Sequence, residues 1–318
     1  MTSISIIIPV YNVEEYVDAC IKSVIAQTYR GPIECIIVDD CGNDRSMEIV
    51  KQIITPYSGP IKFRIIAHDQ NRGLSAARNT GIKNATGEYL YFLDSDDEIT
   101  PTAIASLTEP FMKDTPDIVI GEFKTDGEDT FRHLNIPGNQ LSVGKNCFNQ
   151  FISGNIYEMA WNKLVNRKFI LKHKLYFEEQ LLHEDMQWSF FLFYHSTKII
   201  TTKNISYIYR VRNSGIIGNM SEKNLIHLIR IFDTKFRFII NHDLFRNYTN
   251  LYRHMLSNKA WILECCNKYN QSNSLYNDVR KRMPWHRSYG YRRSIKESFT
   301  AIMLSLGSRS MSLLLRLK

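Results

Sequence analysis

Several features are missing from this sequence of 318 residues, and each absence narrows what the chain can be. No stretch holds 18 apolar residues in a row, so we expect no transmembrane helix. The six cysteines form no C-x-x-C pair and no zinc-binding spacing, which favours core thiols in a reducing cytosol over disulfides. No basic region precedes the first apolar run, so we expect no secretory signal.

Glycine-rich phosphate-binding motifs are missing as well. A nicotinamide-binding domain needs G-x-G-x-x-G after its first strand, but Pro9-Val10-Tyr11-Asn12 stands at that place. The Walker A pattern does not occur anywhere in the chain. A bound diphosphate would therefore have to be neutralised in another way, and a metal ion held by carboxylates is the natural alternative.

Charge is distributed unevenly along the chain. Residues 221–318 hold 18 Lys and Arg against 6 Asp and Glu, a net charge of +12, whereas residues 1–220 carry a net charge of −4. A basic C-terminal third on a mildly acidic body indicates an acidic partner surface. We expect anionic lipid and not nucleic acid, because no RNA-binding motif accompanies the basic and aromatic residues.

The first hundred residues alternate between strand and helix patterns. Apolar runs of strand length predict strands at 3–12, 34–40, 61–67 and 89–93. Helical spacing and cap residues predict helices at 14–29, 47–54 and 74–84. This alternation indicates an α/β domain with a mainly parallel, doubly wound sheet.

The stretch Tyr89–Asp97 carries the strongest chemical signal. Its aromatic run ends in Asp94, Asp96 and Asp97, three carboxylates within four positions. In open α/β sheets, ligands bind beyond the carboxyl ends of the strands. Carboxylates so close together repel one another unless a cation lies among them, so a divalent metal that carries a diphosphate would resolve the repulsion. The alternative is an acidic turn that caps the helix expected to begin at Thr100-Pro101.

The remaining elements follow a less regular pattern. We expect a strand at 117–123, a polar hairpin or mobile flap at 121–144, a helix at 188–194 and a strand at 198–212. Residues 225–251 and 252–269 are predicted to be helical. The predicted domains are residues 1–220, with a nucleotide-binding half at 1–120 and an acceptor half with a lid at 121–220, and a helical basic region at 221–318.

Four blocks resemble a family 2 glycosyltransferase of the GT-A fold, in the family's order and spacing. They are Ile7–Asn12, Val38–Asp44, Asn71–Asn79 and Leu93–Asp97. The resemblance implies a Rossmann-like nucleotide-binding sheet and an inverting transferase that uses a nucleotide-sugar, usually a UDP-sugar, together with Mn²⁺ or Mg²⁺. No Q-x-x-R-W motif of processive members is present, so we expect the addition of a single sugar.

The resemblance also implies roles for individual residues on the donor side. Tyr11 would stack on the base, Asp39 would accept a hydrogen bond from the uracil N3–H, and Asp96 would bind the metal. Arg72 and Arg78 would lie near the phosphates, although a helix-surface position is the alternative for Arg78. The full set of implied nucleotide-binding residues is Pro9, Val10, Tyr11, Glu14, Asp39, Arg72, Arg78, Asp94 and Ser95.

On the acceptor side, Asp185 resembles the family's catalytic base, with Glu184 beside it to orient a sugar or stabilise the loop. One carboxylate within reach of the acceptor hydroxyl is sufficient for inversion by direct displacement. Trp161, Asn162 and Lys163 resemble a W-N-K-L block of bacterial members that build surface polysaccharides, and would contact the acceptor or sugar. The alternatives are an acidic pair at a helix N-terminus and a core tryptophan.

Arg210 and Arg212 resemble the family's Y-x-Y-R segment before a lid, and would clamp the diphosphate unless both are simply solvated. We therefore expect a UDP-sugar donor, a glycan or lipid-linked acceptor, and binding of the basic C-terminus to an anionic membrane, with the enzyme cytoplasmic and peripheral on the inner face. For the tail, packing on the domain is the alternative.

Two other functions remain to be weighed. A non-catalytic sugar-nucleotide or glycan-binding module on the same fold is disfavoured because Asp39, Asp94, Asp96 and Asp185 are all present. A nucleotidyltransferase would need a glycine-rich basic loop after the first strand, and none is there.

Overall fold

The computed structural model describes residues 1–112, 115–129, 133–136, 138–211, 220–269 and 273–281. The chain divides into two compact units. Unit 1 comprises residues 1–151 and 155–212, and unit 2 comprises residues 152–154 and 213–318. The division at residue 220 and the nucleotide and acceptor halves that the sequence suggests stay predictions.

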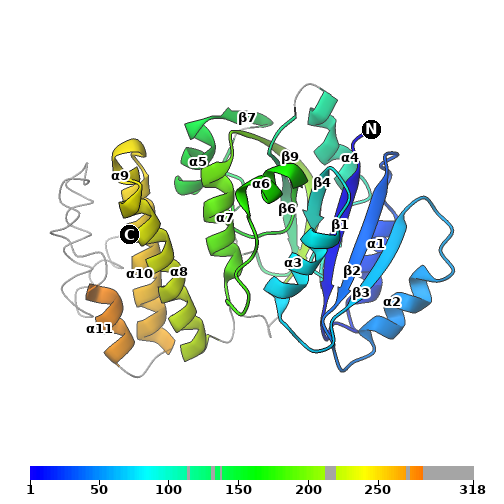
Figure 1. Cartoon of the computed structure of the whole chain (residues 1–318), viewed down its shortest axis with the longest axis horizontal. Coiled ribbons are helices and arrows are strands. Elements are labelled where there is room, and N and C mark those ends of the chain that lie inside the picture. The colour runs from blue at the N-terminus through cyan, green and yellow to red at the C-terminus, as the bar shows by residue number, and fades with distance from the viewer. Residues whose placement is uncertain (113–114, 130–132, 137, 212–219, 270–272, 282–318) are drawn as a thin grey trace. The chain divides into compact units, whose positions relative to one another are not determined.

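Unit 1 is built on a mixed sheet with the strand order β3-β2-β1-β4-β8-β6-β9-β5, and β7 pairs with β9 (Figure 1). The four N-terminal strands are parallel and comprise β1 (Ile4–Val10), β2 (Ile33–Asp39), β3 (Lys62–Ala67) and β4 (Tyr89–Phe92). Every residue of β1 and β4 is buried. Their continuous apolar runs are typical of strands that are covered on both faces of a sheet.

The second half of the sheet departs from the mainly parallel arrangement that the sequence predicts. Its strands are β5 (Glu98–Ile99), β6 (Ile118–Asp126), β7 (Gln140–Val143), β8 (Lys163–Asn166) and β9 (Lys198–Arg210). Strand β8 runs antiparallel to both of its neighbours, β4 and β6, whereas β6 and β9 are parallel. The prediction of a hairpin or flap at 121–144 is wrong in part, because β6 and β7 occupy the two ends of this segment and each pairs with β9.

Seven helices of unit 1 flank these strands in the described part of the chain. They are α1 (Val17–Ile25), α2 (Ser46–Ile54), α3 (Leu74–Asn84), α4 (Ala103–Thr108), α5 (Lys145–Ile152), α6 (Arg167–His173) and α7 (Glu184–His195), with a 3₁₀ turn at Glu109–Met112 after α4. Helix α3 has the predicted bounds. Helix α7 begins four residues before the predicted start, which places Glu184 and Asp185 in its first turn.

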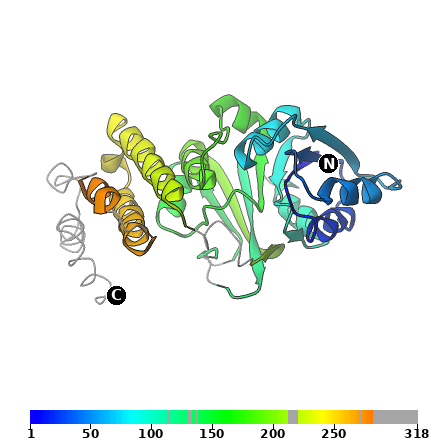
Figure 2. The same cartoon turned by 90° about the horizontal axis from the view of Figure 1, so that it is seen from below.

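Unit 2 is helical where it is described. It contains α8 (Glu222–Asn241), α9 (Leu244–Asn247), α10 (Leu251–Tyr269) and α11 (Asn273–Lys281). Ser221 and Asn224 form a capping box at the start of α8, and α8 packs along α10 (Figure 2). Residues 282–318 of the predicted basic region lie outside the described residues. Within the described part of the chain, no helix is both long and apolar enough to cross a membrane.

The packing of α3 on β1 depends on a glycine. A Cβ atom added at Gly81 would lie 2.2 Å from Ile7 Cγ2, a separation that atoms cannot adopt. Ile7 is fully buried in β1, and its β-branched side chain has little rotamer freedom with which to move away. The missing side chain therefore fixes how closely α3, with Arg78 on it, approaches the sheet.

We expect Gly81→Ala to destabilise the fold by about 1–3 kcal/mol, because it overpacks the α3–β1 contact. At an exposed helix position the same change would stabilise by roughly 1 kcal/mol. Urea unfolding of the wild type, Gly81→Ala, Ile7→Ala and the double variant measures the effect. The double variant should lose less stability than the two single losses added together; simple additivity would contradict the steric explanation.

Candidate functional site

The carboxyl ends of the parallel strands β1, β2 and β4 meet at one edge of the sheet. The register pairs Val10 with Asp39, so the ends of β1 and β2 lie side by side. Tyr11 follows β1 and is 44% exposed, which leaves its ring accessible to a ligand. Pro9 lies within β1, opposite Val38 of β2. Four of the residues implied in nucleotide binding are thus brought together.

The acid loop, residues Leu93–Asp97, follows β4 at this edge. Its backbone closes a turn in which Asp97 N donates to Asp94 O at 3.1 Å. Ser95 and Asp97 are buried, whereas the Asp94 side chain is 23% exposed. The predicted strand end and the cluster of acids beyond it are therefore present, and the carboxylates differ in their surroundings.

Arg78 joins the acid loop to helix α7. Its Nη2 donates to Asp94 Oδ1 and its Nη1 donates to Glu184 Oε1, both at 2.6 Å, and the arginine is only 2% exposed. Burial alone would lower the pKa of the guanidinium, but Asp94 and Glu184 raise it on balance. The helix-surface alternative for Arg78 is wrong, and its proximity to phosphates stays a prediction.

The first turn of α7 holds the predicted base. Burial raises the pKa of the Asp185 carboxyl above its ordinary value, although Arg78 and His183 act in the opposite direction. Burial also raises the pKa of Glu184, to about 7, against the attraction of Arg78. A carboxylate whose pKa is raised towards neutral holds a proton more readily, which suits a general base.

Aromatic packing anchors α7 to the sheet. Trp188 lies against Phe177, with ring centroids 4.7 Å apart, and meets Phe92 of β4 edge-on at 5.6 Å. Its indole Nε1 donates to Leu175 O at 3.0 Å. One turn of helix separates this anchor from Asp185, so the predicted base is attached to a rigid part of the core.

Glu14 and Arg72, two other residues implied in nucleotide binding, have protein partners. Glu14 Oε2 accepts from Arg45 N at 2.9 Å, next to the start of α2. Arg72 Nη2 lies 3.3 Å from Glu179 Oε2, and both side chains are more than a third exposed. Arg72 therefore remains accessible, whereas Glu14 contributes to the loop that precedes α1.

Asp40 forms a buried network that the sequence analysis missed. Its carboxylate accepts hydrogen bonds from Arg72 N, Gly73 N and Asn71 Nδ2, at 2.8–3.1 Å, and lies 2.6 Å from His68 Nδ1. This network fixes the loop that leads into α3. The pair of adjacent acids at the end of β2, followed by a polar loop at 68–73, was the available signal.

The predicted acceptor block Trp161-Asn162-Lys163 is buried, so the structure does not support a direct contact with sugar. Trp161 is 3% exposed and stacks on Tyr207 with centroids 4.4 Å apart. Asn162 accepts hydrogen bonds from Tyr91 and Ser206. Burial lowers the pKa of Lys163 well below its ordinary value. These residues join strands instead of lining a surface. The prediction missed this because the sequence does not reveal which way the face of a tryptophan points.

Arg210 lies at the end of β9, where Nη2 donates to Glu98 Oε1 at 2.8 Å and the guanidinium lies over the ring of Tyr16. Its backbone N–H donates to Asp97 Oδ1 at 2.8 Å. Arg210 thus lies beside the acid loop, and its role as a clamp on the diphosphate stays a prediction. Arg212 lies outside the described residues.

A divalent cation at the acid loop would need substrate to complete its coordination. Among the described residues, no group of three or more His, Cys, Asp and Glu side chains is arranged to hold a metal alone. Burial, followed by repulsion from Asp96 and Asp94, raises the pKa of Asp97 well above its ordinary value. A cation bound at the loop would relieve the repulsion among these carboxylates. Mg²⁺ commonly binds through one or two carboxylates and substrate phosphates.

Comparison with known proteins gives a consistent result. The family model described as "Glycosyl transferase family 2" matches residues 5–173, more than half of the chain. The chain belongs to glycosyl transferase family 2. Glycosyltransferase GlyA of Streptococcus pneumoniae is 32% identical over 266 residues, which are 80% of this chain and 37% of GlyA. The chain thus matches little more than a third of that family member.

Solved structures confirm the predicted GT-A fold. TarS of S. aureus (residues 1–349, in complex with UDP-GlcNAc) has a TM-score of 0.65 at 15% identity, with coverage of 95% of this chain and 90% of TarS. The mannosyltransferase PcManGT of Pyrobaculum calidifontis, in complex with GDP-Man and Mn²⁺, has a TM-score of 0.55 at 14% identity, covering 98% and 86%. At these identities the likeness establishes the fold alone.

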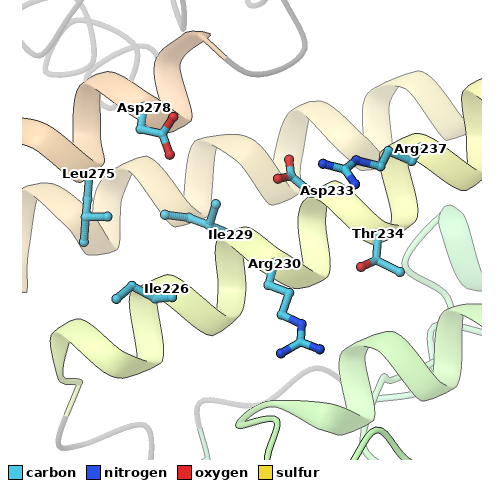
Figure 3. Close-up of a pocket in the computed structure, with 8 residues that line it drawn as sticks. All are labelled: Ile226, Ile229, Arg230, Asp233, Thr234, Arg237, Leu275 and Asp278. Carbon is cyan, nitrogen blue, oxygen red and sulfur yellow. The ribbon is translucent and has the colours of Figure 1, made fainter.

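A cavity in unit 2 has a different character. It has a volume of about 390 Å³, and its lining combines two arginines and two aspartates with apolar side chains (Figure 3). Its lining residues are Ile226, Ile229, Arg230, Asp233, Thr234, Arg237, Leu275 and Asp278. No residue predicted to bind nucleotide, metal or acceptor lines this cavity.

We expect Arg78→Met to destabilise this family 2 chain by about 3–5 kcal/mol, because it leaves two inward-facing carboxylates without their shared cation. Arg72→Met is the matched control, since it removes an exposed ion pair of little value. Guanidinium unfolding at pH 7.5 measures both. Equal losses for the two variants would show that the Arg78 bridge contributes no more than a surface pair.

Proposed function

We propose that the chain is an inverting glycosyltransferase that transfers one sugar from a UDP-sugar to an acceptor hydroxyl, with Mn²⁺ or Mg²⁺ as cofactor. The observation that supports this best is the Arg78 bridge. It connects Asp94 of the acid loop to Glu184, the neighbour of Asp185, in a single buried ion-pair cluster. Donor-side and acceptor-side acids are thereby held in a fixed relation.

Asp185 acts as the general base in this proposal. Its carboxylate takes the proton of the acceptor hydroxyl while the hydroxyl oxygen attacks the anomeric carbon and the bond to the diphosphate breaks. Glu184 holds Arg78 and, through it, the orientation of the first turn of α7. The position of the base in that turn, anchored by Trp188, supports this assignment.

The donor side is assigned to the edge of the sheet. Asp39 accepts from the uracil N3–H, Tyr11 stacks on the base and Asp94 contacts the ribose. A divalent ion at Asp96, when bound, neutralises the diphosphate and stabilises the charge on the leaving group. Arg210 and Arg212 complete the phosphate site. A UDP-sugar in TarS and Mn²⁺ in PcManGT support a metal-dependent nucleotide-sugar site on this fold.

The acceptor we propose is a lipid-linked or other surface-glycan intermediate, reached at an anionic membrane. The support is the net charge of +12 on residues 221–318 and the family resemblance. Acidic lipid headgroups attract polybasic segments by about 1 kcal/mol for each Lys or Arg near the surface. The enzyme would then act as a cytoplasmic protein on the inner face of the membrane.

Calorimetric titration tests the donor assignment. We expect the wild type to bind UDP when Mn²⁺ is present. Neither GDP with Mn²⁺ nor UDP without metal should bind to a comparable extent. Asp96→Asn should weaken the Mn²⁺-dependent binding of UDP, because a carboxylate ligand is lost. Binding of GDP in preference to UDP would refute the role of Asp39. Binding of neither would leave a non-catalytic glycan-binding module as the function to test.

Turnover tests the base assignment. Asp185→Asn should reduce UDP release from the preferred UDP-sugar by about 10²–10⁴-fold, because proton transfer to a positioned base contributes roughly that much. The dissociation constant for UDP with Mn²⁺ should stay close to that of the wild type. Full turnover in Asp185→Asn would show that another group is the base.

The pH profile of kcat/KM should report the Asp185 carboxyl. Activity should fall at low pH as the base becomes protonated. Since burial raises the pKa of Asp185, we expect this fall to occur at a higher pH than for an ordinary aspartate. A positive charge at His183 lowers this pKa. His183→Asn should therefore move the acid limb to higher pH, and asparagine tolerates the left-handed backbone at position 183 (φ 61°). An unshifted acid limb would show that the observed ionisation is not that of Asp185.

A further inference from the structure

The acid loop is held by the phenol of Tyr207, which lies in β9. The Tyr207 hydroxyl of β9 donates to Asp97 Oδ2 at 2.7 Å. The hydroxyl oxygen of Tyr207 also accepts from Asp94 N at 3.3 Å. One hydroxyl group thus contacts the residues on both sides of Ser95 and Asp96. Tyr207 is fully buried, so water cannot replace these contacts without a change in packing.

The ring of Tyr207 is itself held in place by aromatic packing. Its ring stacks on Trp161 with an interplanar angle of 6°, and Tyr209 also lies against that indole, at 5.5 Å. Next to it, Ser206 donates to Asn162 Oδ1 at 2.7 Å. The W-N-K block therefore has a structural use that accounts for its burial, because it fixes the strand that carries the phenol.

We infer that Tyr207 is a positioning residue that sets the acid loop for a metal-bound diphosphate, with Trp161 as its support. The inference rests on the proposed function, since it gives Tyr207 a purpose only if Asp96 binds a cation. Of the three acids, Asp94 is held by Arg78 and Asp97 by Tyr207 and Arg210 N. The backbone that carries Asp96 therefore lies between two residues that are each held by partners outside the loop.

The position of Arg210 extends this argument. Its backbone N–H binds the other oxygen of Asp97, at 2.8 Å, and Tyr207 lies three residues earlier on the same strand. Asp97 therefore connects the acid loop to β9 at two points. A shift in β9 would alter the loop that we propose to hold the metal.

Tyr207→Phe tests the inference, because it removes the hydroxyl and keeps the ring that stacks on Trp161. We expect the Mn²⁺ concentration required for half-maximal UDP binding, measured by calorimetry, to rise about tenfold, as the loss of a hydrogen bond to a charged acceptor predicts. Tyr89→Phe is the matched control. It also removes a buried tyrosine hydroxyl, one that donates to Pro116 O at 2.7 Å, at the opposite end of β4.

Both variants should lose similar stability towards urea, so a purely structural role for Tyr207 predicts similar effects on Mn²⁺ as well. An equal Mn²⁺ requirement in Tyr207→Phe, Tyr89→Phe and the wild type would overturn the inference and leave the proposed function intact. If the wild type itself shows no Mn²⁺-dependent UDP binding, the proposed function fails and this inference fails with it.

Asp97→Asn approaches the same hydrogen bond from the other side and serves if Tyr207→Phe does not fold. It keeps one oxygen for Arg210 N and replaces the acceptor of the phenol by an amide. We expect a similar rise in the Mn²⁺ requirement. In the double variant the rise should be smaller than the two single effects combined, because both substitutions remove the hydrogen bond between Tyr207 and Asp97. Additive effects, or a wild-type requirement in Asp97→Asn, would refute the positioning role.

Discussion

A single buried guanidinium group determines how the candidate site is assembled. Arg78 comes from α3, and its two partners come from the acid loop after β4 and from the first turn of α7. A buried charge is tolerated only when it is paired, and here each partner is needed to neutralise the others. The close packing of α3 on β1 at Gly81 brings Arg78 within reach of both carboxylates. The ion pairs of Arg78 at the edge of the sheet therefore depend on steric packing in the core.

Adjacent acids in this site differ sharply in their surroundings. Asp39 ends β2, and its carboxylate accepts from the nearby Cys41 N, whereas Asp40 is buried and binds the loop before α3. Asp94 and Asp97 likewise meet different partners although two residues separate them. Side chains alternate in direction along a strand, so Asp39 and Asp40 at the end of β2 face different environments, whereas the turn of the acid loop separates Asp94 from Asp97. A motif of repeated aspartates therefore does not describe equivalent groups.

Much of this arrangement could be predicted from the sequence. The bounds of α3, the parallel order of the first strands and the acids at their carboxyl ends all follow from local patterns. The antiparallel insertion of β8 could not be predicted, because pairing between β4 and β8 depends on contacts over some 70 residues of sequence. For the same reason, the pairing of Arg78 with Glu184, 106 positions away, and the burial of Trp161 became visible only in three dimensions.

The chain between β4 and β8 makes a long excursion within one sheet. Tyr91 lies opposite Leu164, so the segment between them adds β5, β6 and β7 to the sheet and then returns beside the strand that it left. Backbone hydrogen bonds between strands require no particular side chains. Loops within such an excursion, such as the one between β6 and β7, can therefore lengthen or drift during evolution while the strand ends that bear the acids remain in register.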